Sequence, residues 1–205
     1  MDVILFGAGS PVIVDIEESC RRAGWRVAAI VRNVAAPDQA GAASLLIDLA
    51  AASPLRLPVL VPLFNPDNRR HAAAEATAHG ATEFPALVDP TAILPARLDL
   101  GAGVYVNAGC TIGAASRLGR FAFVNRGAVL GHHLDLGDFA SIGPGVVVAG
   151  QVTIGEGAQL GAGAVVAPGV RIGAGARVAP GTVVRRDVAA GETVAGNPAR
   201  TVRPQ

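Results

Sequence analysis

Aliphatic residues recur at every sixth position over about half of the chain. From Val88 to Val184, all 17 positions reached by steps of six are Ile, Leu or Val, with no change of phase. A second small or aliphatic residue follows four positions after each, as at Cys110 and Ala128. A period of six is typical of parallel β-helices, in which each coil covers the hydrogen-bonding edge of the preceding one. We therefore expect a repetitive β domain over residues 86–187.

Glycine follows the same period. Of the 19 glycines between 88 and 187, nine lie one position after a repeat aliphatic and nine lie three positions after one. Both phases are typical of turns, where the missing Cβ lets the backbone bend sharply. Gly150 alone is out of phase, because it lies two positions after Val148.

The segment before the repeat, 1–85, has a different pattern, in which apolar runs alternate with helical spacings. Ser10 is the expected N-cap of the first helix and Pro11 its first residue. Such an alternation predicts a small parallel α/β unit. The predicted elements are a strand in 2–10, a helix in 11–24, strands in 25–31 and 57–63, and a helix in 65–80 that begins at Asn65-Pro66 and stops at Gly80.

The turn between the first strand and helix reads Gly7-Ala8-Gly9-Ser10. Free N–H groups at a helix N-terminus, together with the helix dipole, can hold a phosphate. The turn lacks the third glycine of the dinucleotide fingerprint, so a tight strand-to-helix connection also explains it.

Charge and cysteine content narrow the possible functions. The formal net charge is +1, which gives no electrostatic basis for binding nucleic acid or an anionic membrane. The two cysteines form no disulfide framework or metal-binding spacing, and no apolar stretch approaches the length of a transmembrane helix. With no visible secretory signal, these features indicate a cytoplasmic protein.

The run "IGEGAQLGAGAVVAPGVRIGAGARVAPG" resembles the hexapeptide-repeat acyltransferases. That resemblance implies a left-handed parallel β-helix in which three hexads make one triangular coil, with between five and six coils in 88–187. It also implies a homotrimer with active sites between adjacent prisms.

An α/β unit joined directly to such a β-helix resembles a narrower family, the bacterial nucleotide-amino-sugar N-acetyltransferases and sialic-acid O-acetyltransferase-like proteins. The resemblance implies that a Rossmann-like unit, 1–85, binds the nucleotide sugar and that 86–187 binds acetyl-CoA as co-substrate, without a metal. Residues 188–205 then form a C-terminal cap and tail. The implied function is acetyl transfer to the amino group of a nucleotide-linked amino sugar, for a bacterial surface polysaccharide or glycan.

Departures from the family leave the nucleotide open. Relatives follow the first Gly-rich turn with His-Gly, where this chain has Pro11-Val12. They carry acidic residues after the second strand, where this chain has Arg32-Asn33. Asp89 stands where they have histidine, so the acceptor carries a different nucleotide or none. The candidate substrate-binding residues are Gly7, Gly9, Ser10, Arg32, Asn33 and Arg69.

The catalytic candidates come from a family motif, an asparagine followed seven residues later by a histidine and an acid. Here these positions hold Asn125, His132 and His133. Acetyl transfer from a thioester to an amine needs a base, and histidine suits that role near neutral pH. The resemblance therefore nominates His132 as the base. His133 replaces the acid, either as the group that orients His132 or as an alternative base.

Gly150 follows His132 by three hexads, so one coil places it directly above that histidine. Either a closely approaching ligand or a local kink explains a glycine there. A second family histidine is replaced by Ser141, and "AGNPART" resembles the ending that borders the CoA phosphates. The candidate cofactor-binding residues are Gly150, Ser141, Gly196, Asn197, Pro198 and Arg200.

The residues leave three rival functions open. A sugar O-acetyltransferase could use the same base. A metalloenzyme like the γ-type carbonic anhydrases would need three histidines, but the repeats hold only the adjacent pair His132 and His133. A non-catalytic β-helix protein is the third possibility, because the expected acid and nucleotide carboxylates are missing.

Overall fold

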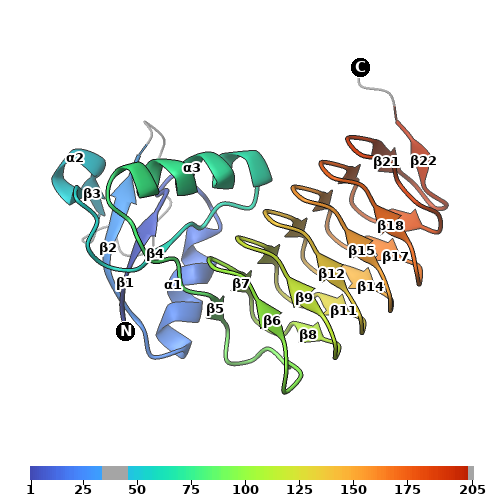
Figure 1. Cartoon of the computed structure of the whole chain (residues 1–205), viewed down its shortest axis with the longest axis horizontal. Helices are drawn as coiled ribbons and strands as arrows, with labels where there is room; N and C mark the ends of the chain where they lie inside the picture. Colours follow the sequence, from blue (N-terminus) through green and yellow to red (C-terminus); the bar gives the residue numbers. More distant parts are fainter. Residues whose placement is uncertain (34–45, 203–205) are drawn as a thin grey trace.

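The structure is a computed structural model that describes residues 1–33 and 46–202. Its first part is a parallel sheet of four strands in the order β3-β2-β1-β4, with helices packed around it (Figure 1). The strands are β1 (Asp2–Phe6), β2 (Arg26–Arg32), β3 (Leu46–Asp48) and β4 (Val59–Leu60), and the helices are α1 (Ile13–Arg22), α2 (Leu49–Ala52) and α3 (Pro66–Ala78).

Two details of this unit differ from the prediction. The sequence predicts one further element of unspecified type between the strands in 25–31 and 57–63, and the structure has the three-residue strand β3 and the four-residue helix α2 there. Segments this short have no measurable hydrophobic period. Helix α1 begins at Ile13 rather than at Pro11, and Val12 is its N-cap. The Ser10 carbonyl accepts from the Ile13 N–H at 3.0 Å, so a separate turn precedes the helix.

Helix α3 begins and ends where the sequence predicts. The Asn65 side chain accepts from the Asn68 N–H at 3.0 Å, and Pro66 is the first helical residue. Gly80, with φ +98°, follows the end of the helix. A cap with an amide side chain and a glycine in the left-handed region are therefore reliable boundaries here.

The rest of the chain winds into a parallel β-helix with three faces (Figure 1). Paired residues on neighbouring coils are 18 apart, as for Phe123 with Ser141 and Val129 with Val147, which confirms the predicted coil length. The first face comprises β5 (Leu87–Val88), β7 (Tyr105–Val106), β10 (Phe123–Val124), β13 (Ser141–Ile142), β16 (Gln159–Leu160), β19 (Arg177–Val178), β21 (Thr193–Ala195) and the antiparallel β22 (Arg200–Thr201). The second face comprises β8 (Thr111–Ile112), β11 (Val129–Leu130), β14 (Val147–Val148), β17 (Val165–Val166) and β20 (Val183–Val184), and the third comprises β6 (Asp99–Leu100), β9 (Arg117–Leu118), β12 (Asp135–Leu136), β15 (Thr153–Ile154) and β18 (Arg171–Ile172). The turn that follows a strand of each face is called the first, second or third corner.

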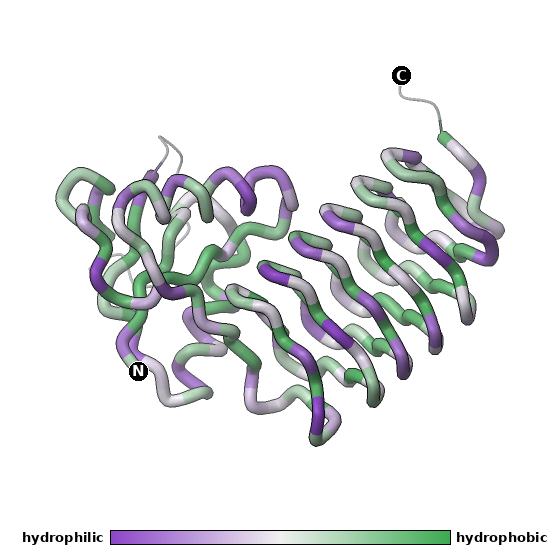
Figure 2. The backbone as a smooth tube through the Cα atoms, in the orientation of Figure 1, coloured by the Kyte–Doolittle hydropathy of each residue, from purple (hydrophilic) through white to green (hydrophobic). Residues whose placement is uncertain are grey.

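The repeat aliphatics fill the inside of the prism. Every one of the 17 predicted positions except Leu94 is the second residue of a two-residue strand. The small residues four positions later, such as Cys110 and Ala128, are buried beside them. Figure 2 shows the resulting alternation of hydrophobic and hydrophilic segments along each coil.

The two glycine phases have different physical causes. All nine glycines three positions after a repeat aliphatic have φ between +63° and +71°, the left-handed region that disfavours a side chain. The nine in the other phase lie against the next coil, where an added Cβ would come within 2.3–2.8 Å of backbone atoms. The expectation of sharp bends therefore holds for the first set, whereas close coil stacking explains the second.

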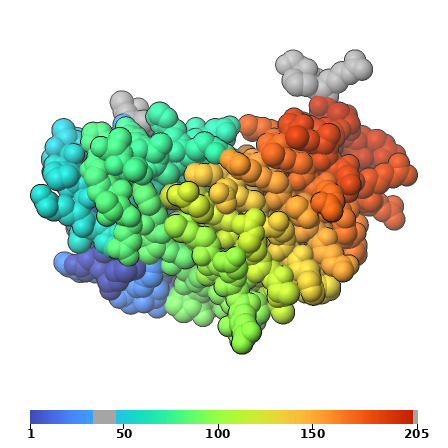
Figure 3. Space-filling view, in the orientation of Figure 1, coloured from blue at the N-terminus to red at the C-terminus, as the bar shows by residue number. Residues whose placement is uncertain are grey.

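The α/β unit packs on the first face of the β-helix, and the two form one continuous surface (Figure 3). Tyr105 and Phe123 project from this face into a cluster with Leu5 and Ile13 of the α/β unit. The first face is therefore covered in its early coils, whereas the second carries exposed aliphatic side chains.

Candidate functional site

His132 and His133 lie at the second corner, directly after β11. Their Nδ1 atoms are 2.9 Å apart, and their rings are nearly perpendicular, with an interplanar angle of 89°. Both side chains are exposed in a single chain. His133 has φ +55°, because it occupies the turn phase that is usually glycine. The turn therefore brings the two rings together.

The ring of His132 extends over Gly150 in the next coil. A Cβ added at Gly150 would come within 2.6 Å of both the Cε1 and Nε2 atoms of His132. Gly150 has no left-handed φ, so the out-of-phase glycine is explained by the imidazole rather than by a kink. In the described part of the chain, the Gly150 N–H has no hydrogen-bond partner, which leaves a donor free beside the imidazole.

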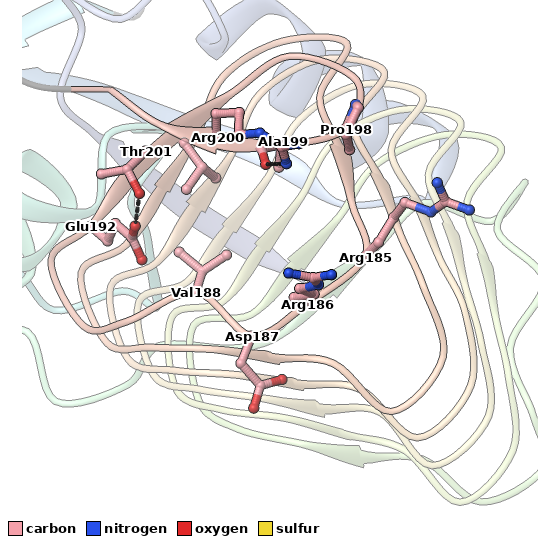
Figure 4. A pocket seen from close by; sticks show the side chains of 10 residues that line it. Arg185, Arg186, Asp187, Val188, Glu192, Pro198, Ala199, Arg200 and Thr201 are labelled. Atoms are coloured by element: carbon pink, nitrogen blue, oxygen red, sulfur yellow. Dashed lines mark hydrogen bonds between the residues drawn. The ribbon is translucent and has the colours of Figure 1, made fainter.

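The second corner continues from His132 toward the last coil of the prism, where arginines line a cavity. Gly150, Pro168 and Arg186 repeat the position of His132 once per coil, and strands of successive coils lie about 4.8 Å apart. Arg186 thus lies about 14 Å along the prism from His132. It lines a cavity of about 560 Å³ at the last coil, together with Arg185 and Arg200 (Figure 4).

This cavity includes part of the predicted C-terminal motif. Pro198 and Arg200 line it, whereas Gly196 and Asn197 precede it in the turn between β21 and β22. Asp187 and Glu192 also line the cavity, so its charge is mixed, with three arginines against two carboxylates. Arg185 and Arg186 were not predicted. Their phase on the corner that carries His132 is the signal that could have identified them.

Asn125 lies at the first corner, at the opposite end of β11 from His132. Its side chain is nearly buried, and its Oδ1 accepts from Asn107 Nδ2 at 3.0 Å and from the Arg126 N–H at 2.8 Å. Within the described residues, the Asn125 Nδ2 has no hydrogen-bond partner. Asn125 and His132 therefore occupy two different corners of the same coil.

Asn125 also borders a groove of about 450 Å³ between the α/β unit and the first face. Val12 and Phe64 line the groove from the α/β side, and Gln159 and Arg177 line it from the β-helix. The Gln159 Oε1 is buried without a hydrogen-bond partner among the described residues. The groove therefore combines apolar walls with unsatisfied amide groups, as is common in sites that bind a small polar ligand.

A separate cavity of about 300 Å³ lies in the α/β unit, at the carboxyl end of β1. Among the predicted residues, Gly7, Gly9 and Asn33 line it, and Asn33 Nδ2 donates to Glu75 Oε2 at 2.7 Å. Ser10 is buried and Arg32 lies 3.7 Å from Asp48, and neither lines this cavity. The unpredicted lining residues are Leu63, Asn68, His71 and Ala72.

Arg69 has a different environment from the predicted one. It is 1% exposed, and all three guanidinium nitrogens donate hydrogen bonds within the protein. Their acceptors include the carbonyls of Leu63 and Phe139 and the Oγ of Ser141. Burial lowers the pKa of this guanidinium, and Arg69 still remains charged at neutral pH. The structure thus makes Arg69 a link between α3 and the β-helix, which counts against the predicted contact with substrate.

Ser141 belongs to the same link. Its side chain is fully buried, and its Oγ donates to the Phe64 carbonyl at 2.6 Å while accepting from Arg69 Nη2 at 2.9 Å. This placement counts against a direct contact between Ser141 and CoA. The sequence could not indicate it, because Ser141 shares its strand position with exposed residues such as Asp135.

Comparison with known proteins identifies the family. A family profile described as bacterial transferase hexapeptide (six repeats) matches residues 151–186. A variant of perosamine N-acetyltransferase from Caulobacter crescentus, solved with CoA and GDP-perosamine, is 33% identical with a TM-score of 0.87, over 100% of this chain and 98% of that chain. The acetyltransferase domain of PglB from Neisseria gonorrhoeae, solved with acetyl coenzyme A, is 29% identical with a TM-score of 0.84, over 98% of each chain. No curated protein matches the chain.

The chain belongs to the hexapeptide-repeat sugar N-acetyltransferases. This acetyltransferase therefore has the expected fold, an α/β unit followed by a left-handed parallel β-helix. WeeI from Acinetobacter baumannii shares that fold at 20% identity, with a TM-score of 0.75. The residues described by the structure contain no group of three or more potential metal ligands, and none of their helices is long and apolar enough to span a membrane.

Proposed function

We propose that this acetyltransferase transfers the acetyl group of acetyl-CoA to the amino group of a nucleotide-linked amino sugar. Relatives solved with CoA and GDP-perosamine, or with acetyl coenzyme A, support this reaction. The main observation in this chain is that the imidazole of His132 lies against the backbone of Gly150, which has no side chain. A base and an accessible thioester are what acetyl transfer to an amine requires.

The reaction follows from this geometry. The neutral sugar amine attacks the thioester carbonyl carbon, and His132 takes one amine proton as the C–N bond forms. The free N–H of Gly150 stabilises the tetrahedral oxyanion. The C–S bond then breaks, and the imidazolium of His132 returns its proton to the CoA thiolate. The products are CoA and the N-acetylated sugar.

We assign acetyl-CoA to the column formed by His132, Gly150, Pro168 and Arg186. A thioester at Gly150 places the pantetheine arm along the second corner, and the arginine-lined cavity then lies where the CoA phosphates end. Arginine suits this position because its guanidinium binds phosphate oxygens in a bidentate fashion. Pro198 and Arg200 remain predicted contacts, and Arg185 and Arg186 join them.

We assign the nucleotide sugar to the α/β unit, residues 1–85, with the β-helix, residues 86–187, as the acetyl-CoA unit. The cavity at Gly7, Gly9 and Asn33 is the proposed nucleotide site, and Asn68 and His71 are additional contacts. The amino sugar then reaches the groove beside Asn125. We propose a cytoplasmic location, since both co-substrates are cytoplasmic metabolites, and a product destined for a bacterial surface glycan.

We propose a homotrimer formed through the second face. Four aliphatic side chains on or beside this face are exposed, Ile93 at 67%, Val129 at 45%, Val147 at 41% and Val165 at 38%. An aliphatic strip of this kind is typical of a contact between subunits. Because Asn125 and His132 lie at the two ends of this face, contact between copies can join the His132 corner of one to the Asn125 groove of another.

A panel of UDP-, GDP- and dTDP-linked amino sugars with acetyl-CoA tests the reaction. We expect thiol release with at least one 4-amino or 3-amino sugar, and none with the matched sugar in which a hydroxyl replaces the amine. His132→Ala should lower kcat at least about a hundredfold with the fold intact. Acetylation of the hydroxyl sugar would instead establish an O-acetyltransferase, and a fully active His132→Ala would exclude His132 as the base.

A further inference from the structure

The two histidine rings share one hydrogen bond between identical atoms. The Nδ1 of His132 and the Nδ1 of His133 are 2.9 Å apart, a distance that requires one N–H and one lone pair. The two neutral rings must therefore be opposite tautomers. If one carries its proton on Nδ1, the other carries it on Nε2.

The position of His132 decides which ring donates. Its Nε2 lies against the Gly150 backbone, where the proposed thioester binds, so a base at this position needs its lone pair on Nε2. The proton of His132 is then on Nδ1, and the Nδ1 of His133 accepts it. This assignment rests on the proposed role of His132 as the base.

We propose that His133 is a positioning residue that holds His132 in the Nδ1–H tautomer by accepting its hydrogen bond. The acceptor is a neutral imidazole, with its own proton on Nε2. When His132 takes the substrate proton on Nε2, its Nδ1–H stays bonded to the same acceptor. No further proton enters or leaves the pair, and the charge of one imidazolium is the only charge that forms.

The backbone of His133 fixes the acceptor in place. Its N–H donates to the Ala114 carbonyl of the coil below at 2.9 Å, and its φ of +55° follows from the turn. Ala115, Phe121, Phe139 and Gln151 also have positive φ, so this conformation alone does not mark a functional residue. The distinguishing feature of His133 is that its Nδ1 meets the ring of its neighbour.

A matched pair of variants separates the effect of the hydrogen-bond acceptor at His133 from the effect of the turn conformation. His133→Asn keeps an acceptor, because Oδ1 of asparagine is the same number of bonds from Cβ as Nδ1 of histidine, and asparagine tolerates positive φ. His133→Gly removes the acceptor while relaxing the turn. Both variants should fold, since nine glycines already occupy this phase.

We expect His133→Gly to lower kcat at least about tenfold with KM for acetyl-CoA unchanged, and His133→Asn to recover to within about threefold of the native rate. Two-bond ¹⁵N–¹H spectra of histidine-labelled protein give an independent readout. The chain has only four histidines, so each can be assigned by substitution. We expect His132 as the Nδ1–H tautomer and His133 as the Nε2–H tautomer in the native protein, and a mixture at His132 in His133→Gly.

A native kcat in His133→Gly, equal losses in the Asn and Gly variants, or an Nε2–H tautomer at His132 would each overturn the proposal. Failure of the proposed function has different signatures: acetylation of the hydroxyl sugar rejects N-acetyl transfer, and a native rate in His132→Ala rejects His132 as the base. If His132→Ala is inactive and His133→Gly is fully active, His132 remains the base and only the positioning role of His133 is rejected.

Discussion

The imidazole of His132 fills the space that a side chain at Gly150 would need. Gly150 therefore contributes to the site twice, by leaving room for the ring and by exposing a backbone N–H beside it. The period of six does not explain why this residue is a glycine, because the other 18 glycines of the repeat stand in the turn or stacking phases. The free N–H is shared by other described residues of this phase, such as Ala114 and Ala162. A residue out of phase in a regular repeat is thus a useful signal of a functional position.

Gly150→Ala tests this relation directly. The new Cβ would lie 2.6 Å from Cε1 and Nε2 of His132, so the ring must turn away from its native position. We expect kcat to fall at least about tenfold, because a base displaced by about an ångström loses its alignment. The same substitution in a His132→Ala background serves as control and should cost no thermal stability, since the clashing ring is absent. A native kcat in Gly150→Ala would show that the ring position does not matter.

The residues whose roles differ from the sequence prediction share one cause. Ser141 occupies the first position of its strand, like the exposed Asp135, and no feature of the repeat distinguishes the two. Only the docking of α3 on the first face buries Ser141 and pairs it with Arg69. The repeat phase predicts which side chains point outward from the prism, but it does not predict which face is covered by the α/β unit.

Secondary-structure elements are best predicted where the sequence repeats with a fixed period or where a helix has a recognisable capping residue. Strand positions follow from 17 aliphatics in phase, whereas the coil length came from the family resemblance, and α3 follows from Asn65-Pro66 and Gly80. Helix α1 lacks a side-chain cap, so its start was misplaced by a separate turn at Ser10. The cavities could not be predicted, because they arise where elements distant in sequence come together.

Helix α1 is joined to the β-helix through the buried carboxylate of Asp89. Arg22 donates to it from Nε at 2.8 Å and from Nη2 at 2.7 Å, and Ser19 and Thr91 donate through their hydroxyls at 2.7 and 2.6 Å. Burial alone raises the pKa of Asp89, but these hydrogen bonds outweigh it and hold the pKa well below the usual range. Asp89 thus has a structural role where relatives carry histidine.

This network predicts a loss of stability in acid. Because the pKa of Asp89 is lower in the folded than in the unfolded state, its stabilisation is complete above about pH 4 and declines as the pH falls through the folded pKa. We expect Asp89→Asn to cost about 2–3 kcal/mol near pH 7, with Arg22 left partly unpaired, and the difference from native to shrink below pH 4. Urea unfolding at fixed protein concentration measures this difference in the free energy of unfolding, and Asp99→Asn, at an exposed position, is the control. A difference that stays constant to pH 2.5 would contradict this role.

In the whole molecule, the two candidate catalytic residues Asn125 and His132 are separated by the length of β11. Asn125 and His132 lie at different corners, so one prism does not bring them to a common point. The exposed aliphatics of the second face lie between these corners. Packing that face against a second copy buries apolar surface and can also complete the site with the partner's residues. In the proposed trimer, assembly and catalysis depend on the same interface.

Mixed trimers test whether each site is shared between copies. Asn125→Ala and His132→Ala should each be nearly inactive alone, yet coexpressed in equal amounts they should recover about a quarter of the native activity. An interface is complete only when one copy supplies His132 and its neighbour supplies Asn125, which random cyclic assembly gives in about one of four arrangements. Light scattering on the same sample gives the oligomeric state, and mixing the purified trimers without exchange of subunits is the control. If both residues act within one chain, the coexpressed sample stays as inactive as either variant, because no combination of copies then restores a complete pair.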